Sequence, residues 1–217
     1  MKNYNRIKIA IDSPAAAGAG TVAKEISKHY KLFYLDTGKI YRYIAYLKIY
    51  HSKEYNLKFI KDKIKKLKIS TLSNKKLISD KVGTVASIIS KNKNIRKIVH
   101  KLQIDFAYNP PKKYKGACLD GRDVTYNIIP DADFKFFITA NVKIRAKRRF
   151  KELKVINKNI RYNDVLKSIK KRDKNDYSRN ISPLKKTKDS VLINTTNLSK
   201  RACFLKIKKI IDKKLNK

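Results

Sequence analysis

The sequence predicts an α/β fold in which a parallel five-stranded sheet carries helices on both faces. Two observations predict it: five short apolar segments each precede a stretch of helical composition, and small or polar residues cluster where these segments end. The length of 217 residues and the 42% of hydrophobic side chains suit a single domain, residues 1–217. Ligands of such sheets bind beyond the carboxyl ends of the strands.

Each element follows from a local pattern. Short apolar runs bounded by turn residues predict strands at residues 7–12, 32–35, 117–120, 134–139 and 190–195. Longer amphipathic stretches predict helices at residues 22–30, 40–50, 85–106, around 146–149, at 163–172 and after 198. The loop SPAAAGAGT between the first strand and helix is typical of a turn that binds phosphate. Asp36-Thr37-Gly38 is a helix-capping signal after the second strand.

One lysine-dense segment, about residues 51–111, interrupts this alternation. It carries weak strand signals at residues 68–71 and 76–79, then the long helix expected at 85–106. The breaker Asn109-Pro110-Pro111 closes it. We therefore expect an excursion from a core formed by about residues 1–50 and 112–217.

Several classes of protein are excluded or disfavoured. No run of about 18 apolar residues exists, which argues against a membrane span. The N-terminal residues lack the pattern of a secretory signal. Cys118 and Cys203 are too few and too distant for a disulfide scaffold or a zinc site. We expect a cytoplasmic protein.

The formal charge of +38 alone would suggest a nucleic-acid-binding protein. However, the 44 lysines accompany abundant Ile, Asn and Tyr, a bias that AT-rich coding produces, and the basic excess runs along the whole chain. We therefore favour a lysine-rich surface over a dedicated nucleic-acid site.

The same bias makes the 11 arginines informative. Where any cation serves, this chain uses lysine, so a retained arginine indicates a need for a planar, bidentate fork such as carboxylate or phosphate recognition requires. Arg6, Arg145, Arg161 and Arg201 are interpreted as surface residues, and the other seven as candidates for a site.

Three blocks in order resemble the bacterial cytidylate (CMP/dCMP) kinases. They are IAIDSPAAAGAGTVAKEISKHYKLFYLDTGKIYR, LDGRDVTYNIIPDADFKFFITANVKIRAKRRFKEL and VLKSIKKRDKNDYSRNISPLKKTKDSVLINTTNLS. The resemblance implies a P-loop nucleoside monophosphate kinase, with the excursion binding the monophosphate and a lid at about residues 148–172. It implies transfer of the ATP γ-phosphoryl group to CMP or dCMP by a monomer, without membrane or nucleic-acid partners.

The resemblance also implies the site. ATP would bind the loop Ser13, Pro14, Ala15, Ala16, Ala17, Gly18, Ala19, Gly20 and Thr21. CMP would bind Thr37, Tyr41, Arg42, Ser87, Arg96, Arg122, Asp123, Asp176 and Arg179. Arg148, Arg149 and Arg172 would close over the phosphates. Mg²⁺ would bind near Thr21 and Asp120.

Some of these residues also have a structural interpretation. Thr37 would cap its helix, GRD would be a tight turn with an ion pair, and Asp120 would cap a strand end. The contacts of Asp123 and Arg96 make chemical sense, because a carboxylate accepts from the N4 amino group that cytosine has and uracil lacks. His29, His51 and His100 show no catalytic spacing and are interpreted as surface or packing residues.

The phosphate loop departs from the pattern Gly-x-x-x-x-Gly-Lys. Ser13 replaces the first glycine, and Ala19 stands where the lysine that grips the donor phosphates belongs. In a chain with 44 lysines, drift in composition is a poor explanation of this loss, and an engineered substitution stays open. Lys39, in DTGKIYR, is the leading candidate for a relocated catalytic cation, and Lys24 is the second. Thr125-Tyr126 also replaces the usual Gly-Thr.

Two alternatives to cytidylate kinase activity stay open from the sequence. One is a non-catalytic basic protein that binds nucleotides or RNA and has lost the lysine. The other is a kinase for another nucleoside monophosphate.

Overall fold

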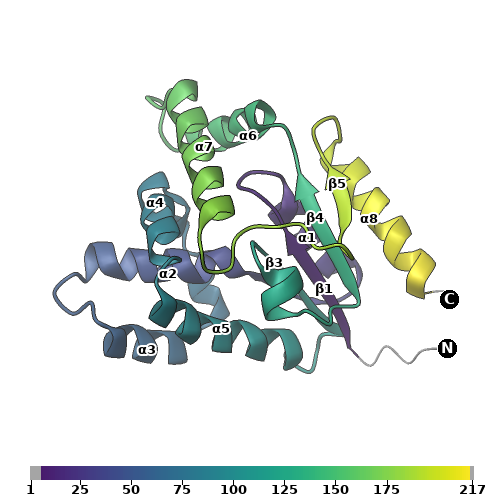
Figure 1. The fold of residues 1–217 in the computed structure, drawn as a ribbon, viewed down its shortest axis with the longest axis horizontal. Coiled ribbons are helices and arrows are strands. Elements are labelled where there is room, and N and C mark those ends of the chain that lie inside the picture. The colour runs from purple at the N-terminus through teal and green to yellow at the C-terminus, as the bar shows by residue number, and fades with distance from the viewer. Residues whose placement is uncertain (1–5, 216–217) are drawn as a thin grey trace.

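The computed structural model describes residues 6–215 and contains a five-stranded parallel sheet in the order β2-β3-β1-β4-β5. The strands are β1 (Ile7–Asp12), β2 (Phe33–Asp36), β3 (Gly116–Gly121), β4 (Phe134–Thr139) and β5 (Val191–Asn194). All four pairings are parallel, and Asp12 lies in register with Gly121 and Phe137. The carboxyl ends of the central strands therefore meet at one edge, as the sequence predicted (Figure 1).

Helices cover both faces, which confirms the predicted fold class. Alternate side chains of β1 point to opposite faces: Ile9 and Ile11 pack against α1 (Ala19–His29) and α8 (Lys200–Leu215), whereas Ala10 packs against α2 (Thr37–Tyr50). Strand β5 lies at the sheet edge and leaves Val191 and Leu192 exposed.

The excursion forms a helical layer beside the sheet, between α2 and β3 (Figure 1). It contains α3 (Leu57–Lys65), η1 (Ile69–Ser73), η2 (Lys75–Ile78), α4 (Asp80–Ile89) and α5 (Lys93–Tyr108). The two weak strands predicted here are wrong, because these short segments form 3-10 turns that pack Leu72 and Leu77 into the core.

The single helix predicted at residues 85–106 is also wrong. The chain breaks between Ser90 and Asn92, where Asn92 caps α5 by accepting a hydrogen bond from the backbone N–H of Ile95 at 3.0 Å. The sequence signal was present, since KNKN places two capping residues in the middle of the apolar periodicity.

Two further helices, α6 (Val142–Lys154) and α7 (Tyr162–Ser178), pack on each other through a small cluster that includes Ala146 and Ile169. They stand together beyond the carboxyl ends of the strands (Figure 1). A π-turn, η3 (Val124–Ile128), follows β3. No helix within residues 6–215 is long and apolar enough to cross a membrane.

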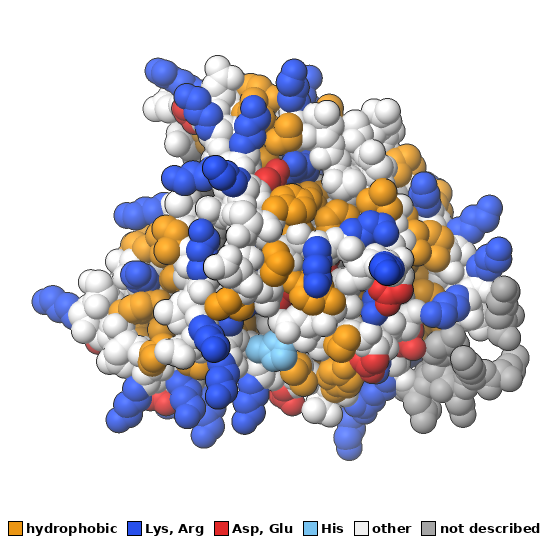
Figure 2. Space-filling model, viewed as in Figure 1, with side chains coloured by type: hydrophobic (Ala, Val, Ile, Leu, Met, Phe, Trp, Pro, Cys, Tyr) orange, Lys and Arg blue, Asp and Glu red, His pale blue; other side chains and the backbone are white. Residues whose placement is uncertain are grey.

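The basic charge is distributed rather than concentrated. On the face drawn in Figure 2, lysine and arginine side chains are scattered and interspersed with apolar, uncharged polar and acidic groups. Cys118 and Cys203 are buried and free. Burial raises the pKa of the Cys118 thiol to about 12, so it has no nucleophilic role at neutral pH.

Candidate active site

A cavity of about 400 Å³ opens at the carboxyl ends of β1, β2 and β3 and reaches between the excursion and α6–α7. It brings together segments that are far apart in the sequence. Predicted site residues that line it are Ser13 to Thr21, Thr37, Tyr41, Arg42, Ser87, Arg96, Asp120, Arg122, Asp123, Arg149, Arg172, Asp176 and Arg179. Lys39 and Arg148 do not line it.

Residues 13–21, here called the donor loop, connect β1 to α1. The loop turns sharply because Ala16 and Gly18 adopt left-handed conformations with φ of 59° and 90°. No side chain caps the start of α1, so its first backbone N–H groups are left for a ligand. Such a helix start is a ready site for phosphate.

Two arginines of α6 that do not line the cavity, Arg145 and Arg148, contact the donor loop. Arg145 donates to the carbonyl of Ala15 at 3.0 Å and forms a fork with the carboxylate of Asp173, at 3.0 and 2.6 Å. Arg145 is buried, so its interpretation as a surface residue is wrong, whereas Arg6, Arg161 and Arg201 are exposed.

Arg148 also supports the loop rather than lining the cavity. It donates to the hydroxyl of Thr195 at 3.0 Å and to the Thr195 carbonyl at 2.6 Å, and lies 3.4 Å from the carbonyl of Ala17. Both Arg145 and Arg148 therefore use their planar forks on protein acceptors.

Lys24 is the one lysine in the described chain that lines the cavity. It lies one turn after Gly20 on α1, with its ammonium 5.9 Å from the centre of the Tyr34 ring. Lys39 is half-buried on α2, where its backbone N–H donates to the capping Asp36 at 3.2 Å. The sequence predicted Lys39 as the leading candidate for the relocated cation, but Lys24, the second candidate, is the lysine that lines the cavity.

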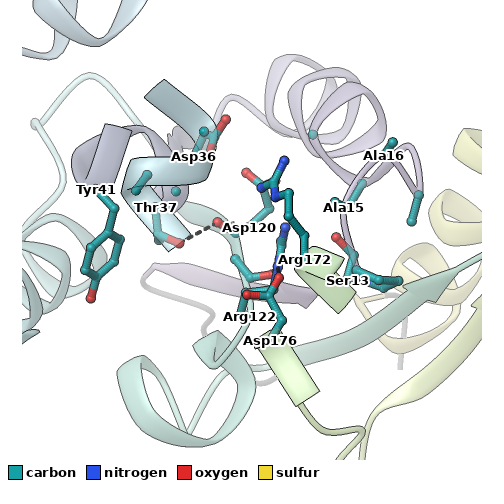
Figure 3. Close-up of a pocket in the computed structure, with 18 of the residues that line it drawn as sticks. Ser13, Ala15, Ala16, Asp36, Thr37, Tyr41, Asp120, Arg122, Arg172 and Asp176 are labelled. Atoms are coloured by element: carbon teal, nitrogen blue, oxygen red, sulfur yellow. Dashed lines mark hydrogen bonds and ion pairs between the residues drawn. The ribbon is translucent and has the colours of Figure 1, made fainter. Parts of the chain in front are cut away.

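On the opposite side of the cavity, Thr37 and Tyr41 extend from α2 while Ser13, Ala15 and Ala16 lie across from them (Figure 3). Thr37 donates to the carbonyl of Asp120 at 2.8 Å. This contact needs glycine at position 121, since a Cβ there would come 2.3 Å from the Thr37 hydroxyl. The helix cap is Asp36, so Thr37 does not serve as the cap.

Arg42 packs against the excursion. It donates to the carbonyls of Leu77 and Ser79 at 2.7 and 3.2 Å. Gly83 leaves room for its guanidinium, because a Cβ at that position would lie 2.8 Å from Arg42 Nη2. The excursion thus places Arg42 in the cavity wall.

The break between α4 and α5 places the next pair. Arg96 donates to the carbonyl of Ser90 at 3.2 Å and to Asp123 Oδ2 at 2.5 Å, and both side chains are buried. Ser87 also lines the cavity, from α4. Ser87 and Arg96 therefore converge from two helices, α4 and α5, and not from the single helix predicted at residues 85–106.

Three further charged residues meet at the centre of the cavity. Arg122 donates through Nε to Asp176 Oδ2 at 2.7 Å. Burial opposes ionisation of Asp176, but Arg122 lowers its pKa below the ordinary value. Arg179 is buried and its Nη2 makes no hydrogen bond, lying 4.0 Å from Asp123 Oδ1. Burial, together with the like charge of Arg96, lowers the pKa of Arg179.

Arginines from α6 and α7 complete the wall. Arg149 donates to the carbonyl of Ile78 at 2.9 Å and so connects α6 to the excursion. Arg172 extends from α7 into the space between Thr37 on α2 and the donor loop, close to Arg122 and Asp176 (Figure 3). Six arginines thus line one cavity, and they come from α2, α5, the loop after β3, α6, α7 and the loop after α7.

Two carboxylates lie beside the donor loop. Tyr34 donates to Asp120 Oδ1 at 2.8 Å, and Asp36 lines the same part of the cavity. Burial and the neighbouring Asp36 charge raise the pKa of Asp120 to about 8. No cluster of three or more His, Cys, Asp or Glu residues occurs among the described residues.

Sequence reasoning missed Asp12. Its carboxylate is fully buried and accepts hydrogen bonds from the backbone N–H groups of Val124 and Thr125, at 2.8 and 2.9 Å, and from the Thr125 hydroxyl at 2.6 Å. Burial raises its pKa to about 6. A charged residue that ends an apolar strand was the available signal.

The fold defines a class: an α/β phosphotransferase of the P-loop type, here with a helical segment inserted between α2 and β3 and with arginines of α6 and α7 at the cavity. The sequence profile of the family described as cytidylate kinase matches residues 9–213. This chain belongs to the cytidylate kinase family, ATP-dependent phosphotransferases that act on CMP or dCMP, which confirms the predicted family and activity.

Individual relatives agree along nearly the whole chain. A cytidylate kinase of Bartonella tribocorum is 42% identical over 201 residues, covering 90% of each chain. One of Clostridium botulinum is 38% identical and one of Mesomycoplasma hyopneumoniae 34%, covering 95% and 98% of this chain and 98% and 96% of theirs. An uncharacterized protein of Eubacterium ventriosum shares the fold at a TM-score of 0.56 and 17% identity, covering 95% of this chain and 99% of that one.

Proposed function

We propose that the cavity binds CMP or dCMP on its acceptor side and ATP on the donor loop, with the arginines of α6 and α7 between them. The observation that carries this proposal is the buried pair formed by Arg96 and Asp123, which faces the same cavity as the uncapped start of α1. The acceptor side consists of Thr37, Tyr41, Arg42, Ser87, Arg96, Arg122, Asp123, Asp176 and Arg179.

The base is selected by hydrogen bonds. Asp123 Oδ2 already accepts from Arg96, so Oδ1 is the oxygen available to the N4 amino group of cytosine. Uracil has a carbonyl at that position, which would face a buried carboxylate without a proton between them. Discrimination of this kind reaches orders of magnitude.

The monophosphate is bound by arginine forks. Arg179 carries a buried Nη2 without a hydrogen-bond partner, and a phosphate oxygen would satisfy it while neutralising the repulsion from Arg96. Arg42 and Arg122 line the same space, and Asp176 orients Arg122. Thr37 supports this side through Asp120.

The donor phosphates take their cation from Lys24. Helical side chains lean toward the N-terminus, so the Lys24 stem, which starts about 6 Å along α1 from Gly20, can return its ammonium to the start of the helix. Lys24 makes no hydrogen bond or ion pair in the described chain. Its charge is thus available to the donor phosphates, whereas Lys39 lies outside the cavity wall.

Mg²⁺ fits the oxygen groups beside the donor loop. Thr21, Asp36 and Asp120 offer one hydroxyl and two carboxylates, and Mg²⁺ characteristically combines one or two carboxylates with phosphate oxygens and water. When bound, the ion would neutralise phosphate charge. The raised pKa of Asp120 is consistent with a carboxylate pair that needs such a cation.

Catalysis in this arrangement is positioning and charge neutralisation. The acceptor phosphate oxygen attacks the γ-phosphorus in line with the leaving β-phosphate oxygen, and Arg149 and Arg172 stabilise the charge that spreads over the transferred group. No His or Cys nucleophile is needed, and the described histidines serve elsewhere: His100 Nε2 lies 3.0 Å from the Asn127 carbonyl.

A coupled assay with ATP and CMP, dCMP, UMP or AMP tests the proposal. We expect CMP and dCMP to be phosphorylated at least a hundredfold better than UMP, about the discrimination that a hydrogen-bonding pocket provides. Equal turnover of UMP and CMP would overturn the base assignment, and preferential turnover of AMP would favour a kinase for another monophosphate. Family membership disfavours the non-catalytic alternative; the monomeric state and the cytoplasmic location remain predictions.

A further inference from the structure

Asn127 touches the base-recognition pair from outside the cavity. It lies on η3, four residues after Asp123, and does not line the cavity. Its side-chain amide donates to Asp123 Oδ2 at 2.7 Å and lies 3.4 Å from the Ser182 hydroxyl. Its backbone N–H donates to the Asp123 carbonyl at 3.0 Å.

We propose that Asn127 is a positioning residue that fixes the Asp123 carboxylate and so sets the preference of this enzyme for cytosine. This inference rests on the proposed function, since it concerns how the acceptor side reads the base.

The two carboxylate oxygens of Asp123 have different surroundings. Oδ2 accepts from two donors, Arg96 at 2.5 Å and Asn127 at 2.7 Å, which approach from α5 and η3. Two donors on one oxygen fix the rotation of the carboxylate. Oδ1 accepts no hydrogen bond from either donor and lies 4.0 Å from Arg179 Nη2, in a residue that lines the cavity.

Loss of the Asn127 amide would free the Asp123 carboxylate to rotate. Arg96 also donates to the Ser90 carbonyl, and its guanidinium can pair with either oxygen or with both. Without Asn127, the carboxylate is free to rotate toward Arg96 and Arg179, and both of its oxygens would serve arginines. The N4 amino group would then lose its acceptor.

Asn127 also contacts the loop that carries Arg179. The Arg179 Nε donates to the Ser182 carbonyl at 2.6 Å, and Asn127 contacts the hydroxyl of the same serine. Ser182 adopts a left-handed conformation with φ of 51°. Asn127 therefore stands between the residue that reads the base and the loop that holds a phosphate-binding arginine.

Contacts with α5 and with the 179–184 loop hold Asn127 and its neighbour Tyr126 in place. His100 Nε2 lies 3.0 Å from the Asn127 carbonyl, and the neighbouring Tyr126 hydroxyl donates to the Pro183 carbonyl at 2.5 Å. The backbone of η3 is thus fastened to α5 on one side and to the 179–184 loop on the other. Because the Asn127 side chain is short and its backbone is fixed, it loses little conformational entropy when it binds Asp123.

The test compares Asn127→Leu, which keeps the size but removes the donor, with Asn127→Asp, which replaces the donor by an acceptor. Steady-state kinetics with CMP and UMP should show the KM for CMP rising about tenfold for Asn127→Leu and further for Asn127→Asp, the effect of losing a hydrogen bond to a charged group. The kcat should change less than about threefold, and turnover of UMP should not fall in parallel. Asn197→Leu, an exposed asparagine, is the matched control.

If Asn127 had only a structural role, its substitution would affect CMP and UMP equally. If CMP and UMP lose kcat/KM by the same factor, or if both variants keep the wild-type ratio of CMP to UMP, the inference is overturned while the proposed function stands. If the wild-type chain phosphorylates neither nucleotide, both are overturned. Should Asn127→Leu not fold, the isosteric Asn127→Asp decides on the same ratio.

Discussion

The two halves of the cavity are built differently. The acceptor side carries four arginines, two of them buried, that are held by carboxylates or carbonyls, so its cations are fixed before any ligand arrives. The donor loop carries small residues and lacks the lysine of its pattern. Lys24, exposed, is the only lysine among the described residues that lines the cavity, whereas the guanidinium groups of Arg145 and Arg148 at this loop already donate to protein acceptors. The acceptor side is preorganised by polar contacts, whereas the donor side depends on backbone geometry and one flexible side chain.

Removing Lys24 should have the largest effect, because it is the only lysine among the described residues that lines the cavity, and the two arginines at the donor loop are already bound to protein acceptors. We expect Lys24→Ala to lower kcat about a hundredfold, the typical loss when one preorganised charge or donor is removed from a transition state. Lys28→Ala, on the same helix but outside the cavity, and Lys39→Ala should change kcat less than about twofold. Steady-state kinetics with saturating CMP measure this; a Lys39→Ala variant as damaged as Lys24→Ala would contradict the placement.

The two halves are joined by Asp12, which ends β1 before the donor loop and binds the backbone of Val124 and Thr125. Its pKa of about 6 exceeds the ordinary value of 3.8, so between these values the folded chain holds a proton that the unfolded chain has released. Stability is therefore greatest below about pH 4 with respect to this group and falls as the pH rises through 6, by about 3 kcal/mol.

Asp12→Asn removes that titration. In urea unfolding, the difference in unfolding free energy between wild type and variant should shrink by about 2–3 kcal/mol from pH 4 to pH 7. A difference that stays constant over this range would show that Asp12 is already ionised at pH 4.

The next smaller effect concerns the acceptor arginines. Arg179→Lys and Arg42→Lys keep the charge but lose the fork, so each should raise the KM for CMP about tenfold. Arg201→Lys is the control, since Arg201 is exposed and lies outside this cavity. Three variants that behave alike would refute the idea that retained arginines mark the site.

The smallest effect concerns the shape of the donor loop. Ala16 has φ of 59°, where glycine avoids a cost of about 1 kcal/mol that is partly offset by the greater freedom of the unfolded chain. Ala16→Gly should therefore stabilise the chain by about 0.5 kcal/mol in urea unfolding. Ala15→Gly, next to it without a positive φ, should destabilise; stabilisation by both would show that strain is not the cause.

Much of the fold could be predicted because strand periodicity and turn residues are local signals. The five strands follow from such patterns, and Asp36 caps α2 as DTG indicated. The helices expected at residues 22–30 and 40–50 begin three residues earlier, at Ala19 and Thr37. The break at Ser90 was missed because an apolar stripe runs through it, although the break is what brings Arg96 to Asp123.

Within the site, resemblance identified residues whose types are specific to the chemistry, but not the contacts that hold them. Arg145 was misassigned because its partners, Asp173 and the Ala15 carbonyl, are 28 and 130 residues away. Lys39 and Lys24 could not be distinguished from spacing alone, since the direction of each side chain depends on how its helix packs on the sheet.

The double-mutant cycle of Ala19→Lys and Lys24→Ala tests most directly whether Lys24 has taken over the donor side. We expect Ala19→Lys alone to raise kcat less than about threefold, because the charge is already present, and Ala19→Lys to restore at least about tenfold of the activity lost in Lys24→Ala. A large gain from Ala19→Lys alone, together with an unaffected Lys24→Ala variant, would contradict the account and show that the donor loop is defective and uncompensated.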